Sequence, residues 1–283
     1  MLRSVASLQY ICSKCCSVLN GSADIAIADI GSLNEDCPSC GAPLSKTLFR
    51  ARTLPERKSL PQTIGSAYEL LSFRFDIEKI DSFIRLANQD SLCIVGPGAI
   101  MILTRLCVRA LLPAMHGGLN SPYLIVVDAG NKSDFYQAVD FARQYGANVD
   151  DILDRMIVTR TFTIHQLKTF LSLQLGKVMQ RYQAKIAIIP GLLEMFDDPN
   201  ISEKEAKKVI SSMLRSMKTV SRQALVIASV VSGKYTDSIT SSFAKRISII
   251  NGGDKRLAAV MHVDGRTQSI ILCKTELVTP AYE

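Results

Sequence analysis

Short, continuously apolar runs alternate with amphipathic stretches over most of this 283-residue chain. Each run has the length of a buried strand, and the stretches between them repeat apolar residues at helical spacing. Such alternation is typical of a parallel sheet covered by helices on both faces. The predicted strands are 92–95, 123–128, 155–160, 185–190 and 224–231, and the predicted helices are 76–84, 99–112, 135–145, 164–182 and 202–220.

The end of the chain follows a different pattern. Three short runs, 246–250, 257–263 and 268–273, are joined by Asn251-Gly252-Gly253 and Asp264-Gly265. These turn residues favour tight hairpins. The sequence therefore predicts an α/β fold whose mostly parallel sheet ends in an antiparallel edge.

The first predicted strand of this sheet leads into Gly96-Pro97-Gly98 and then into a long apolar helix. A strand, a glycine-rich turn and a helix form the frame of a phosphate-binding loop. A working loop continues with Lys and then Ser or Thr, because the ammonium group reaches the outer phosphates and the hydroxyl holds magnesium. Ala99 and Ile100 take those two places here. The frame is thus a degenerate Walker A motif, and we expect no bound ATP.

Four of the eight cysteines form two Cys-x-x-Cys pairs, Cys12 with Cys15 and Cys37 with Cys40, separated by 21 residues. Two such pairs give a closed tetrahedral site of four thiolates, the structural form of zinc binding. The short isoleucine-rich run 24–28 between them is long enough for a strand. We therefore predict a small zinc ribbon over residues 1–50 that folds around a structural Zn²⁺. Cys16 could replace Cys15 in a shifted pair.

We predict a basic linker, interrupted by prolines, over residues 51–70 and a second domain over residues 71–283. The linker either contacts phosphates or is merely solvated. Three further cysteines lie among apolar residues, which predicts buried thiols: Cys93, Cys107 and Cys273. This use of cysteine indicates a reducing, cytoplasmic compartment. No run approaches the roughly 20 apolar residues of a membrane span, so we expect no membrane partner.

The net charge is +7 and the sequence pI is near 9.0. This excess favours an acidic partner such as nucleic acid only mildly, because a soluble basic surface explains it equally well. The histidines are scattered, and Asp128 ends an apolar strand without a visible catalytic partner. An enzymatic function finds little support in these residues.

The core from about residue 71 to 279 resembles the RecA-type fold, most closely the archaeal and eukaryotic recombinase branch (RadA and its paralogues). The resemblance rests on the order and spacing of several stretches: 77–84, 112–120, 127–128 with 141–146 and 151–155, and 255–258 followed by a final hairpin. It implies a RecA-like sheet and a place in DNA recombination, repair or replication.

The same resemblance shows which nucleotide-handling groups are missing. The lysine and hydroxyl positions of the loop are Ala99 and Ile100. Where the resemblance places an acidic residue after the second strand, this chain has Gly130. Pro190 replaces the magnesium-supporting aspartate after the fourth strand, and Val230 replaces the phosphate sensor after the fifth. Because phosphoryl transfer depends on these positioned charges, their joint loss predicts a pseudo-ATPase.

Two groups of residues are candidates for binding nucleic acid, with single-stranded DNA as the expected form. The first is a basic stripe within an arc of about 100° on the helix that begins near Ser202: Lys204, Lys207, Lys208, Arg215, Lys218 and Arg222. The second occupies the place of a DNA-binding loop in the recombinases: Lys234, Tyr235, Lys245 and Arg246. A plain solvated helix face is the alternative explanation for the stripe.

We therefore expect a non-catalytic recombinase paralogue that binds DNA or scaffolds an active recombinase or another complex. The alternative is a RecA-fold scaffold subunit of an RNA-modification or transcription assembly, without a DNA role. Two further alternatives are a weak, non-standard ATPase and an unrelated doubly wound domain in which Gly96-Pro97-Gly98 is only a tight turn.

Overall fold

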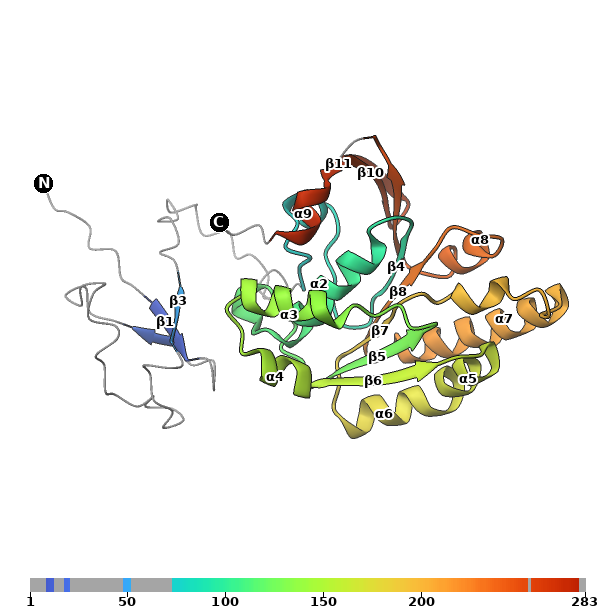
Figure 1. Cartoon of the computed structure of the whole chain (residues 1–283), viewed down its shortest axis with the longest axis horizontal. Helices are drawn as coiled ribbons and strands as arrows, with labels where there is room; N and C mark the ends of the chain where they lie inside the picture. Colours follow the sequence, from blue (N-terminus) through green and yellow to red (C-terminus); the bar gives the residue numbers. More distant parts are fainter. Residues whose placement is uncertain (1–8, 13–17, 21–47, 52–72, 254–255, 280–283) are drawn as a thin grey trace, which may run out of the picture. The chain divides into compact units, whose positions relative to one another are not determined.

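A computed structural model of the chain describes residues 9–12, 18–20, 48–51, 73–253 and 256–279 (Figure 1). Contacts between residues divide the chain into two compact units, Met1–Ser66 with Gly146–Asn148, and Ala67–Tyr145 with Val149–Glu283.

In the first unit the described residues form a small antiparallel sheet. Its strands are β1 (Gln9–Cys12), β2 (Val18–Asn20) and β3 (Leu48–Ala51), in the order β2-β1-β3. Cys12 ends β1. The other predicted zinc ligands (Cys15, Cys37 and Cys40), the run 24–28 and nearly all of the linker 51–70 lie outside the described residues. The zinc ribbon therefore stays a prediction.

The second unit is built on an eight-stranded mixed sheet of order β11-β10-β9-β4-β8-β7-β5-β6. The strands from β4 to β8 and the β4–β9 pair run parallel, whereas β9, β10 and β11 pair antiparallel. This confirms the predicted α/β sheet with an antiparallel end. The strands are β4 (Ser91–Val95), β5 (Leu124–Ala129), β6 (Met156–Thr161), β7 (Ile186–Ile189), β8 (Leu225–Val230), β9 (Lys245–Asn251), β10 (Arg256–Val263) and β11 (Arg266–Cys273).

Helices cover both faces of the parallel part of the sheet, with α2 and α3 on one side and α5, α6 and α7 on the other (Figure 1). The helices are α1 (Glu78–Asp81), α2 (Ala99–Leu111), α3 (Phe135–Gln144), α4 (Val149–Asp154), α5 (Ile164–Thr169), α6 (Leu175–Arg181), α7 (Glu203–Val220), α8 (Thr236–Thr240) and α9 (Lys274–Val278).

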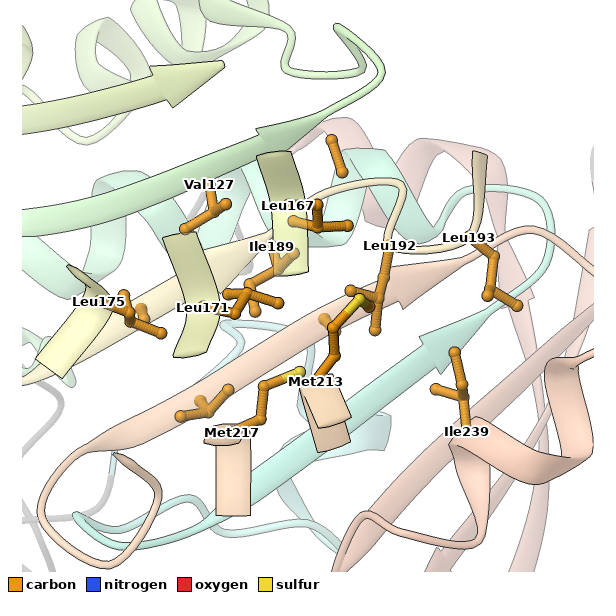
Figure 2. Packing of buried hydrophobic residues seen from close by; sticks show 14 of the residues in the cluster. Val127, Leu167, Leu171, Leu175, Ile189, Leu192, Leu193, Met213, Met217 and Ile239 are labelled. Atoms are coloured by element: carbon orange, nitrogen blue, oxygen red, sulfur yellow. The ribbon is translucent and has the colours of Figure 1, made fainter. Parts of the chain in front are cut away.

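The core on the α5–α7 side is formed by aliphatic side chains. Figure 2 shows Leu167, Leu171 and Leu175 packed near Val127 and Ile189 of the sheet, and all of them are buried. Met213 and Met217 of α7 enter the same cluster (Figure 2). Burial on this scale is what holds short parallel strands together, because each large aliphatic side chain contributes about 1.5–3 kcal/mol.

Some sequence predictions differ from the structure in detail. The helix predicted over 76–84 is only α1, because Asp76 adopts a left-handed backbone (φ 62°) and Ile77 is extended. The helix predicted over 164–182 is interrupted by a π-helical turn at Phe170–Gln174. Cys93 and Cys107 are buried as predicted, but the prediction for Cys273 is wrong, since it is exposed at the start of α9.

Two arginines of α2 are buried inside the second unit. Arg105 is 0% exposed and Arg109 is 1% exposed. Arg105 donates hydrogen bonds to the backbone oxygens of Asp76 (2.9 Å) and Thr279 (2.5 Å), and its guanidinium lies over the ring of Phe141. One arginine thus joins α2 to a segment before β4, to α3 and to the end of the described chain.

Arg109 extends this buried network. It donates to the backbone oxygens of Arg74 (2.7 Å) and His116 (2.9 Å), and its Nη1 lies 3.8 Å from Oδ2 of Asp76. The hydroxyl of Tyr145 donates to the same carboxylate oxygen at 2.8 Å. Burial raises the pKa of Tyr145, so the phenol stays protonated and remains a donor.

Replacing Arg109 with Met should lower the free energy of unfolding by about 3–5 kcal/mol, because it removes the buried cation that lies 3.8 Å from the Asp76 carboxylate. Urea denaturation at neutral pH measures the loss. Arg143→Met on α3 is the control, because the Arg143 side chain is 69% exposed and its change should cost at most about 0.5 kcal/mol. Similar losses in the two variants would contradict a structural role for the buried pair.

Candidate functional site

The turn Gly96-Pro97-Gly98 is packed tightly against neighbouring elements. Both glycines have left-handed backbones, with φ of 96° and 81°. A Cβ at Gly96 would lie 2.0 Å from the backbone oxygen of Ile249 in β9, and a Cβ at Gly98 would lie 2.8 Å from Cδ1 of Leu277 in α9. The glycines are therefore required by close packing, whether or not an anion binds.

Backbone hydrogen bonds connect the loops that follow the parallel strands. The Gly96 amide donates to the oxygen of Val230 (3.1 Å), and the Ala129 amide donates to that of Pro190 (3.2 Å). The Gly130 amide donates to the oxygen of Thr161 (3.2 Å). Ligands of open α/β sheets usually bind at this carboxyl edge. Here backbone hydrogen bonds at this edge tie one strand end to the next.

Asp128 does have partners, although the sequence showed none. It is fully buried at the end of β5, and its Oδ1 accepts hydrogen bonds from the amides of Lys132 (2.6 Å) and Ser133 (3.0 Å). Its Oδ2 lies 3.6 Å from Nε of Arg160 on β6. The carboxylate therefore fixes the loop after β5, which is a structural role.

The basic stripe lies on the exposed face of α7. The helix begins after Ser202, as predicted, and the Ser202 hydroxyl accepts a hydrogen bond from the Glu205 amide. Ala206, Val209, Ile210, Met213 and Met217 are buried on one side. All cations of the stripe are exposed on the other side: Lys204, Lys207, Lys208, Arg215, Lys218 and Arg222.

Few acidic groups compensate this stripe. Lys207 pairs with Glu203 at 2.7 Å, and hydrogen bonds from Lys207 and Lys234 lower the pKa of Glu203 to about 2. Residues 206–222 contain no Asp or Glu. In the part of the chain that the structure describes, the other cations of the stripe form no ion pair: Lys204, Lys208, Arg215, Lys218 and Arg222.

The second group of predicted nucleic-acid residues is engaged within the fold. Lys234 pairs with Glu203 at 2.9 Å, and Tyr235 is only 8% exposed, with its ring edge-on to that of Phe196. Lys245 donates to Oδ2 of Asp90 and to the Arg85 oxygen, both at 2.5 Å.

Arg246 is half-buried, with Nη1 3.5 Å from Oγ1 of Thr240. The stripe on α7 is therefore the freer of the two cationic surfaces.

The buried cysteines of β4 and α2 do not offer reactive thiols. Burial raises the pKa of both Cys93 and Cys107 to about 12, so neither forms a thiolate near neutral pH. Within residues 73–253 and 256–279 no cluster of His, Cys, Asp and Glu could hold a metal ion. None of the helices in these ranges is both long and apolar enough to cross a membrane.

Comparison with known proteins identifies no family for this chain. No protein-family model matches the sequence, and no curated protein matches it either.

Replacing Gly96 with Ala should destabilise the protein by at least about 2 kcal/mol more than Gly253→Ala, because the new methyl group meets a backbone oxygen that cannot turn aside. Gly253 is a matched control. Its φ is also left-handed (100°), but nothing lies within 4 Å of a Cβ there, so only backbone strain of about 1–2 kcal/mol applies. Urea denaturation of both variants is the measurement, and equal losses would show that the turn is not held by packing.

Proposed function

We propose that this chain is a non-catalytic RecA-family paralogue that binds DNA or scaffolds a recombination, repair or replication complex. Support for the family comes from the sequence resemblance together with the mixed sheet, in which the strand before Gly96-Pro97-Gly98 is interior and the last strands are antiparallel. Support for the absence of catalysis comes from Ala99, Ile100, Gly130, Pro190 and Val230, none of which offers the charged or polar side chain that phosphoryl transfer needs.

The observation that carries the DNA proposal is the stripe of exposed cations along α7, of which Lys207 alone forms an ion pair among the described residues. The helix has 18 residues, which corresponds to about 27 Å at 1.5 Å per residue. A row of exposed cations, most of which form no ion pair among the described residues, attracts a phosphodiester backbone and releases its counterions. Of the forms of DNA we favour the single strand, whose flexible backbone can follow such a row.

The zinc ribbon completes the proposal. Cys12, Cys15, Cys37 and Cys40 would hold a structural Zn²⁺, because four thiolates form a closed site without an open coordination position. We therefore assign the metal no catalytic role. The ribbon would contact DNA or a partner subunit.

Replacing Lys208, Arg215 and Arg222 together with Ala should weaken single-stranded DNA binding by at least about tenfold at low salt. Five unpaired cations predict a slope of log K against log salt of about −3.5, and removing three of them should reduce its magnitude by about 2. Fluorescence anisotropy over a salt series measures both quantities. Magnesium ATP should change neither.

Arg143, Lys177 and Arg181 provide the control for this experiment. They are exposed on α3 and α6, so replacing them with Ala removes the same charge from other surfaces. The control variant should bind DNA as the unmodified protein does. If no DNA binding is seen at low salt, or if both variants lose it equally, α7 is not a DNA surface and a scaffold without a DNA role becomes the better explanation.

The purified chain should contain about one zinc ion, in keeping with a single four-thiolate site. Cys37→Ser should remove most of this zinc and lower the melting temperature of the amino-terminal unit, since metal binding supplies its folding free energy. Cys273→Ser is the control, because this exposed thiol lies far outside the predicted ligand set. Metal analysis by mass spectrometry measures the content. Unchanged zinc in the Cys37 variant would exclude the predicted ligand set.

A further inference from the structure

The antiparallel end of the sheet has one buried face and one exposed face. In β10 the buried side chains are Leu257, Ala259, Met261 and Val263, and the residues between them are at least partly exposed. The pairing register arranges the exposed-face residues in rows across the strands: Arg246, His262 and Thr267; Ser248, Val260 and Ser269; Ile250, Ala258 and Ile271; and Arg256 with Cys273.

One of these rows is apolar although it faces outward. Ile250 and Ile271 are each 59% exposed, and Ala258 between them and Val260 in the next row are partly exposed. An antiparallel sheet with one solvated face normally places polar residues there. Large aliphatic side chains grouped on such a face are typical of a protein interaction site.

The charged side chains that β9, β10 and β11 place on this face are the arginines Arg246 and Arg256. None of the three strands contains Asp or Glu. Arg256 is exposed on one side of the apolar row, and the half-buried Arg246 lies on the other side, beside His262. Burial and the neighbouring Arg246 lower the pKa of His262, so the two arginines carry the positive charge of this face. Because residues rise about 3.4 Å along a strand, Arg256 and His262 lie about 20 Å apart, with the apolar row between them.

We propose that the exposed face of β9, β10 and β11 docks an acidic amphipathic helix of a partner protein. Neighbouring strands lie about 4.8 Å apart, so Ile250 and Ile271 are separated by about 10 Å. Apolar residues at positions i and i+7 of a helix are separated by about the same distance. A helix of about 10 Å diameter lying across the strands presents one acidic flank to Arg256 and the other to the half-buried Arg246.

Side-chain chemistry favours a protein partner over nucleic acid on this face. Bases bind protein surfaces largely by stacking on aromatic rings. The exposed apolar residues here are aliphatic, and β9, β10 and β11 contain no Phe, Tyr or Trp. This interface is separate from the DNA surface proposed for α7 and does not depend on it.

Two synthetic peptides of about 18 residues test this interface on the full-length protein. Both contain the same Leu, Glu and Ala residues, but only one has them in amphipathic order. The amphipathic peptide should bind at least about tenfold more tightly than the scrambled one, as measured by fluorescence anisotropy. A photo-crosslinking residue introduced at Ser269 should capture the amphipathic peptide.

Replacing Ile250 and Ile271 together with Glu should weaken binding of the amphipathic peptide by at least about tenfold. Leu173→Glu is the control, because Leu173 is 65% exposed on another surface and its change should leave binding intact. Since all three side chains are exposed, the melting temperatures should stay close to that of the unmodified protein. Substituting Lys208 and Arg215 on α7 together with Arg222 just beyond it should not affect peptide binding.

Several outcomes would overturn the proposal. One is equal binding of the two peptides, and another is full binding by the isoleucine variant. Loss of single-stranded DNA binding in that variant, with peptide binding unchanged, would identify the face as a nucleic-acid surface. Concentration-dependent self-association that the same variant abolishes would identify the occupant as a second copy of this chain.

Discussion

The buried pairing of Arg105 and Arg109 with the segment around Asp76 is the constraint on which the second unit depends. A charged group removed from water must find charged or hydrogen-bonding partners, because its desolvation costs several kcal/mol. Here those partners come from the segment before β4, the turn after α2, and residue Thr279. Burying α2 therefore requires all these parts of the chain to be in place together, so the network makes distant segments fold as one unit.

The position of α2 in turn determines what the preceding turn can do. The amide of Gly96 is bonded to β8, its α-carbon lies against β9, and Gly98 lies against Leu277 of α9. Arg105 of α2 also bonds to the backbone of Thr279, just beyond α9. Helix α2 therefore holds both the turn that contains Gly98 and the α9 segment against which Gly98 packs. This arrangement of strand, turn and helix binds phosphate in other proteins. Here it is a tightly packed connection, and the loops at the carboxyl edge of the sheet are hydrogen-bonded to one another.

The sequence predicted the parts of this structure that depend on local pattern. Continuous apolar runs located the strands, and the capping serine and helical spacing located α7, because burial and capping act over a few residues. The buried network depends on contacts between distant segments, so residue spacing could not show it. One signal was present: Thr104, Arg105 and Arg109 are the only polar residues of α2, and a helix so largely apolar is expected to be buried together with its arginines. The left-handed Asp76 and the exposed Cys273 follow from tertiary contacts and had no such signal.

The stripe on α7 and the exposed face of β9–β11 lie on the same side of the sheet. Cys93 is buried in the cluster beneath α7, and it is paired in register with Arg246, whose side chain therefore points to that side. The two surfaces differ in chemistry, since α7 offers cations without apolar neighbours and the strands offer aliphatic side chains between cations. A phosphate backbone gains little from exposed isoleucines, and an amphipathic helix gains little from cations alone. The two proposed interfaces therefore suit different partners, although both lie on this side of the sheet.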